Sequence, residues 1–300
     1  ELGSLSEEEA KKLLHGVLSR LDEIPQAFVN EAVEMTGGNP YFLEQLVRLL
    51  ISQEIITVGK DKWELDWELF QETDLPLSVE EAVQARVAAL SPFERLLLEM
   101  AATMGNVFWF GGLVVLSRLE EGIAGTEATW KSTEPIEKLK HSVENLVEHE
   151  YLMKMPDSWV ERDQEFVFKH NLEYKTIKDS TNPQKVKAWH HLVAQWLESR
   201  LQQRNEEQLD TLGQHYQAGG NKRRAAYCFV RAGDQARSRF ANEQAMHFYK
   251  TGLGLLDPSE SLSRIDALHN LGDVCALVGR TKEALRYFEE MSHNAYLLDN

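Results

Sequence analysis

The residues of this chain that could carry chemistry come first in a short turn, Thr36-Gly37-Gly38-Asn39-Pro40, which precedes an apolar helix pattern. Glycines adopt positive φ angles and let a backbone approach a ligand closely, and a proline at a helix start offers a flat apolar ring. These properties suit one half of a nucleotide site, with Gly38, Asn39 and Pro40 as the candidate contacts. The same residues also make a good helix stop followed by a helix start, so a structural role is the alternative.

Complete catalytic motifs are absent from the sequence. It contains no Gly-x-x-x-x-Gly-Lys-Ser/Thr loop and no apolar strand that ends in an acidic pair able to hold magnesium. The histidines at 190, 191 and 215 lack the spacing of metal ligands, and neither His-Glu-x-x-His nor Gly-x-Ser-x-Gly occurs. We therefore expect this segment not to hydrolyse ATP by itself and to hold no catalytic or metal-binding residues.

The composition predicts a soluble, cytoplasmic protein of two or three domains. The 300 residues are 43 % hydrophobic and 27 % charged, and no run of about 18 apolar residues could span a bilayer. The two cysteines, Cys228 and Cys275, lie in helix patterns and indicate no disulfide framework. The chain begins with Glu1 and shows no signal-peptide pattern, so we expect further protein upstream of it.

Charge is unevenly spread along the chain. The net charge of -16 argues against a general nucleic-acid surface. Basic residues are nevertheless concentrated in the middle, where they could face an anion or an acidic partner, or form solvated helix faces. They are Lys169, Lys175, Lys178, Lys185, Lys187, Lys222, Arg223, Arg224, Arg231, Arg237 and Arg239.

Residues 1–73 predict a small helical module with a short hairpin. A capping box over Ser6 to Glu9 starts a first helix, and a second ends at the glycines of the turn. A third helix runs from Tyr41 to about Ile51. Residues 55–58 and 63–65 then read as two strands joined by a turn.

Residues 74–180 predict a winged-helix-like domain. Serines 78 and 91 cap two helices, and a helix from Pro135 to His149 follows a polar loop over residues 120–134. Residues 151–155 and 165–168 have the alternating or aromatic pattern of strands. Helices followed by a two-stranded wing are typical of the winged helix.

Residues 181–300 predict helical repeats. Small and aromatic residues recur at the same offsets around Gly233 and Gly272, which resembles the tetratricopeptide pattern. We expect two repeats, at about 222–256 and 261–295, after an irregular helix pair at about 186–218. Gly213 fits the pattern too, but it lies too close to Gly233 to begin another unit. The last repeat lacks a polar cap, so we expect the array to continue beyond Asn300.

Four stretches, in order, resemble the signal-transduction NTPases with numerous domains (STAND), specifically predicted bacterial ATPases with a helical lid, a winged helix and tetratricopeptide repeats after a P-loop core. The stretches are residues 37–46, residues 74–78 with 85–91, Ala101-Ala102 with Gly105 and Phe108, and residues 166–172. The resemblance covers nearly the whole chain. It implies a mainly α fold, with the lid over 1–73, the winged helix over 74–180 and a truncated α-solenoid of repeats over 181–300.

The resemblance also implies roles for individual residues. The family's Gly-x-Pro motif places a proline against adenine, and Gly38-Asn39-Pro40 occupies that position. Its Met-His-Asp-like motif reaches the β-phosphate of ADP through the histidine, and Lys169-His170-Asn171 corresponds, with lysine and asparagine replacing methionine and aspartate. We expect ATP or ADP with magnesium in the parent protein and no cofactor in this segment.

Together these expectations describe the regulatory and sensor segment of a STAND-type signalling ATPase. Lid and winged helix would close on ADP beside the ATPase core of the same parent chain, and the repeats would bind a protein partner. One alternative is an interaction scaffold that binds no nucleotide. Another is a DNA-binding transcription regulator, which needs a basic recognition helix, whereas residues 134–149 carry more glutamates than lysines.

Overall fold

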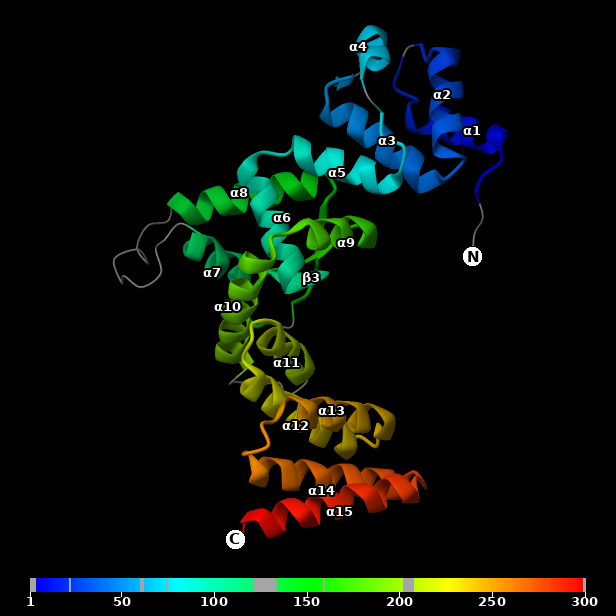
Figure 1. Cartoon of the computed structure of the whole chain (residues 1–300). Coiled ribbons are helices and arrows are strands. Elements are labelled where there is room, and N and C mark those ends of the chain that lie inside the picture. The colour runs from blue at the N-terminus through cyan, green and yellow to red at the C-terminus, as the bar shows by residue number, and fades with distance from the viewer. Residues whose placement is uncertain are drawn as a thin grey trace. The chain divides into compact units, whose positions relative to one another are not determined.

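The computed structural model describes residues 4–21, 23–59, 62–73, 75–120, 134–158, 160–201 and 208–298. The fold is mainly α-helical with two small sheets, as the sequence predicts (Figure 1). The chain divides into two compact units. The first comprises Glu1–Ala102, Thr133–Lys154 and Val167–Ser180, and the second comprises Thr103–Ser132, Met155–Phe166 and Thr181–Asn300. Residues 60, 61 and 74 and most of the predicted 120–134 loop lie outside the described residues.

The first unit begins with three helices: α1 (Glu7–Val17), α2 (Gln26–Thr36) and α3 (Pro40–Ser52). The capping box is confirmed, since the Glu9 carboxylate accepts a hydrogen bond from the Ser6 amide at 2.9 Å. Helix α2 ends at Gly37, whose φ of 56° is left-handed and suits glycine. Local sequence signals therefore fix these helix ends.

A small hairpin and a short helix complete the core of this helical module. Strands β1 (Ile56–Val58) and β2 (Trp63–Leu65) are antiparallel. Helix α4 (Trp67–Glu72), which the sequence analysis missed, starts where the Asp66 carboxylate accepts from the Leu69 amide at 3.0 Å. It buries Phe70 against Phe28 of α2, with ring centroids 4.8 Å apart.

Four further elements complete the first unit: α5 (Val79–Ala89), α8 (Glu134–Glu148), β4 (Leu152–Lys154) and α9 (Asn171–Ser180). Helix α6 (Pro92–Met104) leads out of this unit. The predicted caps at Ser78 and Ser91 are confirmed, because both hydroxyls accept from the amide three residues on. Helix α9 was not predicted and begins directly after His170.

The second unit contains β3 (Val107–Trp109) and α7 (Phe110–Glu120). Strand β5 (Glu165–Phe168) starts in this unit and ends in the first, and it neighbours β3 on one side and β4 on the other. Within the second unit, Phe108 stacks on Phe166 with centroids 5.8 Å apart. The order from α6 to β5 is helix, strand, helix, helix, strand, strand. The assignment of residues 74–180 as a winged-helix-like domain and the three domain boundaries stay predictions.

Helical hairpins make up the rest of the second unit. Their helices are α10 (Pro183–Leu201), α11 (Leu209–Ala218), α12 (Lys222–Ser238), α13 (Asn242–Leu255), α14 (Ser261–Leu277) and α15 (Thr281–Leu298) (Figure 1). The helical-repeat architecture predicted for this region is confirmed. Over the residues that the structure describes, no helix combines the length and apolarity needed to cross a membrane.

Glycines allow an aromatic ring to lie against the preceding helix in each hairpin. A Cβ on Gly233 would come within 2.7 Å of the Tyr249 ring, and one on Gly272 within 2.5 Å of the Phe288 ring. Gly213 makes the same kind of contact, since a Cβ there would lie 3.2 Å from the Phe229 ring. The overlapping match at Gly213 therefore reflects α11 packing on α12 as α12 packs on α13.

Candidate functional site

The Gly38-Asn39-Pro40 turn is held by the first unit itself. The Gly38 carbonyl accepts from the Leu5 amide at 2.9 Å, and the φ of Gly38 is +72°. The Asn39 side chain caps α3 by accepting from the amides of Tyr41 and Phe42 at 3.0 and 3.2 Å. These contacts account for glycine and asparagine by local structure, and a role of either residue toward a ligand stays a prediction.

Pro40 lies at the edge of a cavity of about 460 Å³ in the first unit. Most of its lining is apolar and comes from α1 and α3, and Glu44, Arg48 and Glu150 add charged groups. The lining residues are Leu13, Leu14, Val17, Pro40, Tyr41, Leu43, Glu44, Val47, Arg48, Ile51, Trp63 and Glu150. An apolar cavity of this size with a few polar groups is typical of small-molecule sites.

His170 packs against the residue that follows Pro40. Its ring centroid lies 5.1 Å from that of Tyr41, and its carbonyl accepts from the Tyr174 amide at the start of α9. Burial, and then the positive charge of Arg48, lowers the pKa of His170, so the ring is neutral at neutral pH. Its Nε2 is buried and has no hydrogen-bond partner in the described structure. The fold therefore brings together the two segments that carry the predicted site residues.

Three polar residues on α3 face this region and were missed by the sequence analysis. Tyr41, Gln45 and Arg48 stand at positions i, i+4 and i+7, which share one face of a helix. Each of them has a buried polar atom with no partner among the described residues: the Tyr41 hydroxyl, Gln45 Nε2 and Arg48 Nη1. Polar residues at this spacing on one face of a largely apolar helix were the available signal.

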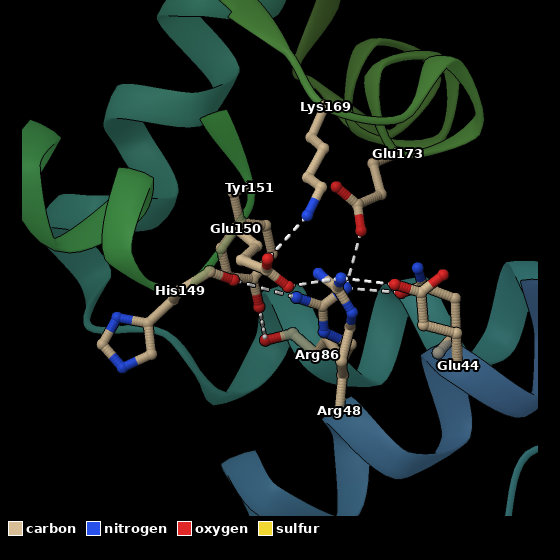
Figure 2. Close-up of polar contacts among 9 residues, drawn as sticks. Glu44, Arg48, Arg86, His149, Glu150, Tyr151, Lys169 and Glu173 are labelled. Carbon is tan, nitrogen blue, oxygen red and sulfur yellow. Dashed lines mark hydrogen bonds and ion pairs between the residues drawn. The ribbon is translucent and has the colours of Figure 1, made fainter. Parts of the chain in front are cut away.

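A buried ion pair lies on the same side of α3. Arg86 of α5 is 3 % exposed and Glu173 of α9 is fully buried, and Arg86 Nη1 lies 2.6 Å from Glu173 Oε1. The same guanidinium donates to the Gln45 side-chain oxygen and to the His149 carbonyl. Figure 2 shows Glu173 reaching Arg86 from the helix above it. This cluster joins α3, α5 and α9.

Two opposing effects act on the pKa of Glu173 beside Arg86. Burial raises the pKa of Glu173, while the adjacent Arg86 lowers it, and burial is the larger effect. The guanidinium also lies over the Tyr151 ring, 4.4 Å from its centroid, and the Tyr151 hydroxyl donates to the Arg86 carbonyl at 3.0 Å. The arginine is thus enclosed by partners on several sides.

A second, more exposed ion network borders the cavity. Arg48 pairs with Glu44 at 2.5 Å and also with Glu150, which in turn accepts from Lys169 at 2.6 Å (Figure 2). The hydrogen bond from Lys169, followed by the charge of Arg48, lowers the pKa of Glu150 against the opposing effect of burial. Lys169 directly precedes His170, so this network ties the histidine segment to α3.

The second unit carries a separate groove of about 850 Å³ along the repeats. It is lined by Glu198, Arg223, Arg224, Tyr227, Val230, Arg231, Asp234, Leu256, Glu260, Ser263, Asp266, His269 and Asn270. Its basic residues have acidic neighbours: Arg224 pairs with Glu198 at 2.6 Å and Arg223 with Glu260 at 3.5 Å. The groove therefore carries charge of both signs.

Two histidines far apart in sequence meet in the second unit. The Nδ1 atoms of His190 on α10 and His215 on α11 lie 2.8 Å apart, and the ring centroids lie 5.0 Å apart. A hydrogen bond between them requires one ring to donate and the other to accept. Their spacing in the sequence gave no indication of this pair.

Comparison with known proteins gives few matches. No family model and no curated protein sequence matches the chain. Among solved structures, the chain is similar to the Signal Transduction ATPase with Numerous Domains (STAND) protein with a tetratricopeptide repeat sensor from Pyrococcus horikoshii, with a TM-score of 0.45 and 12 % sequence identity. The match covers 99 % of this chain and 42 % of that one, so this chain spans less than half of the length of that protein.

Proposed function

We propose that this chain is the regulatory and sensor segment of a STAND-type signalling ATPase. The helical module and the winged-helix-like region close on ADP, and the repeats bind a protein partner. The observation that carries the proposal is the contact between Tyr41 and His170, because it joins the turn of Pro40 to the histidine segment. These are the two stretches whose residues resemble the family's nucleotide motifs.

The residues around this contact fit a nucleotide. Pro40 and the apolar lining residues of the cavity suit a flat base. Arg48 Nη1 and, outside that lining but against Tyr41, His170 Nε2 are buried hydrogen-bonding atoms without partners in the described structure. Arginine and the ring N–H of histidine both donate to phosphate oxygens. Bound ADP would supply the phosphate charge that these donors recognise, while hydrolysis would require the P-loop core of a parent protein.

Regulation would follow from a shift between two states. A ligand of the repeats changes this equilibrium only if it binds one state more tightly than the other. The buried Arg86–Glu173 pair and the Arg48–Glu150–Lys169 network hold α3 to the histidine segment in the described state. Nucleotide exchange that moves His170 would therefore have to strain or open these contacts.

The first experiment is to read the gene upstream of Glu1 for a Gly-x-x-x-x-Gly-Lys-Ser/Thr motif within roughly 250 residues. In the parent protein, His170→Ala should lower ADP affinity by about 10- to 100-fold, the effect of losing one charge-assisted hydrogen bond. ADP retained after gel filtration, measured by chromatography, gives the readout. His149→Ala is the matched control, because only the backbone carbonyl of His149 contacts Arg86. Equal ADP retention in both variants would contradict the proposal.

The mixed-charge groove of the repeats favours a second candidate function, an interaction scaffold without nucleotide. The two candidates make different predictions for the upstream gene. If no P-loop is encoded there, the nucleotide proposal fails and the interaction scaffold is the remaining candidate function. If one is present, partner binding to the repeats should change ADP release, which a passive scaffold would not do.

A further inference from the structure

The Glu150 carboxylate bridges two cations from different segments of the first unit. Its Oε1 lies 2.6 Å from the Nζ of Lys169, and its Oε2 pairs with the Nη2 of Arg48. Lys169 directly follows β5, whereas Arg48 belongs to α3. Figure 2 shows Glu150 between these two side chains. A small anion is therefore held by two donors that meet only in the folded chain.

Arg48 has two anionic partners on one nitrogen and a free donor on the other. Its Nη2 also lies 2.5 Å from Glu44, one turn earlier on the same helix, so this side chain keeps a partner without Glu150. Its Nη1 is buried and has no hydrogen-bond partner among the described residues. Arg48 and Glu150 both line the cavity of about 460 Å³. An anion in this cavity can therefore take the free donor and replace Glu150.

Glu150 can leave this position without disturbing the fold. Its side chain is 49 % exposed, so water can solvate the carboxylate once it is displaced, and exposed ion pairs contribute little to stability. The turn that carries it is held by backbone atoms. The Glu150 amide donates to the Val147 carbonyl and the Tyr151 amide donates to the Leu146 carbonyl, both at 3.0 Å. Removal of the carboxylate should therefore leave the turn in place.

We propose that the space between Arg48 and Lys169 is a phosphate subsite and that Glu150 is its internal competitor. The carboxylate occupies the position that the terminal phosphate of a bound nucleoside diphosphate takes. Arginine and lysine both bind phosphate as well as carboxylate groups. The inference rests on the proposed nucleotide function and adds Lys169 as a phosphate ligand, a role that the resemblance does not imply because methionine stands at this position in the family.

The exchange of one anion for another lets the first unit keep the same contacts with and without nucleotide. Glu150 links Lys169 to Arg48 in the described structure, and a phosphate in its place would maintain that link. Lys169 directly precedes His170, whose Nε2 is buried and has no partner among the described residues. A phosphate carries more negative charge than a carboxylate and has three acceptor oxygens. Removal of the Glu150 charge should therefore tighten phosphate binding.

Equilibrium dialysis of the full chain against labelled inorganic pyrophosphate tests the subsite without a base. Glu150→Gln should bind about two- to fivefold more tightly than wild type, the gain expected when an exposed ion pair no longer competes with the ligand. Glu148→Gln is the matched control, because it removes the same charge from an exposed residue at the end of α8. In 0.1 M salt the Debye length of about 10 Å screens more distant charges, so this control should stay close to wild type.

Lysine variants test the second cation of the subsite. In the Glu150→Gln background, Lys169→Met should remove the gain, whereas Lys175→Met, at an exposed lysine of α9, should keep it. A damaged fold would weaken binding, so a gain in affinity is specific to the loss of a competitor. Equal or weaker binding by Glu150→Gln than by wild type, absence of saturable binding in both, or a gain that survives Lys169→Met would overturn the proposal.

ADP retention by the parent protein separates this inference from the proposed function. In that protein Glu150→Gln should raise ADP retention, whereas His170→Ala should lower it. If ADP is retained and Glu150→Gln does not raise its retention, the subsite is wrong and the proposed function stands. If the wild-type parent retains no ADP, the proposed function fails together with the nucleotide assignment, and any pyrophosphate binding then identifies a site for a free anion.

Discussion

Replacement of Arg86 by methionine should destabilise the first unit strongly at neutral pH. Methionine keeps much of the length of the side chain but removes the charge, which leaves the Glu173 carboxylate fully buried without its cation. Breaking a buried ion pair by removing one partner costs about 3–5 kcal/mol. The variant also loses the hydrogen bonds of the guanidinium to Gln45 and His149, so we expect a loss toward the upper end of that range.

The size of this loss should depend on pH in a defined direction. The pKa of Glu173 is already raised by burial, and removal of the opposing charge of Arg86 raises it further. An acid with a raised pKa in the folded state contributes stability that is complete below its unfolded pKa and is lost as the pH rises through its folded pKa. The difference between wild type and Arg86→Met should therefore increase as the pH rises above 4.5, from the smaller cost of the lost hydrogen bonds to Gln45 and His149 alone.

Urea unfolding followed by circular dichroism at a series of pH values measures this difference, and hydrogen exchange of α3, α5 and α9 locates it. Glu173→Gln is the informative companion, because glutamine resembles the protonated acid: its difference from wild type should be smallest at low pH, where wild-type Glu173 is itself protonated. The double variant Arg86→Met/Glu173→Leu should recover most of the stability. A loss below about 1 kcal/mol that does not change with pH would refute this reasoning. Such a loss is typical of a solvent-exposed ion pair, whose removal leaves no buried, unpaired charge.

Three further predictions concern packing, thiol chemistry and the exposed ion network. Gly233→Ala should lower the free energy of unfolding by about 1–3 kcal/mol, because its Cβ would lie 2.7 Å from the Tyr249 ring. Gly254→Ala is the control: a Cβ there meets open space and should not lower the free energy of unfolding, and thermal melts of both variants measure the difference. Burial raises the pKa of Cys228 to about 11, so its thiol should resist iodoacetamide at pH 8 until urea unfolds the chain. Mass spectrometry measures the alkylation, and rapid alkylation of the folded protein would contradict this expectation. Lys169→Met should cost less than about 1 kcal/mol at pH 7, since Glu150 is half-exposed. The cost should begin to decrease below pH 4.5 and be lost as the pH falls through the lowered pKa of folded Glu150, and urea unfolding measures this together with any salt dependence.

Helix boundaries were predictable where the signal is local. Ser6 with Glu9 and the glycine at 37 mark helix ends through contacts within a few residues, and the sequence contains these signals directly. Helix α4 was missed although Asp66 gives it a standard cap, because a helix of six residues shows no periodicity. The tetratricopeptide-like spacing was readable because the glycine-to-aromatic contact repeats at a fixed distance along the chain.

The candidate site was predictable only in part, because its charged partners come from distant segments. Arg86 stands in an ordinary helix pattern, and nothing near it in the sequence indicates Glu173, which lies 87 residues further on. The positions of Pro40 and His170 came from a resemblance, and their contact through Tyr41 required the folded chain. The roles of Gly38, Asn39, Pro40 and His170 toward nucleotide stay predictions.

The division of the first unit into three chain segments has a consequence for synthesis on the ribosome. Helix α5 emerges with the charge of Arg86 long before Glu173 has been made, and at 5–20 residues per second the delay is on the order of ten seconds. During that time the arginine is hydrated and α3 lacks part of its covering. The nascent chain therefore cannot complete this unit until residue 180 has left the exit tunnel, and a pause in translation between residues 102 and 167 would lengthen its exposure to chaperones and proteases.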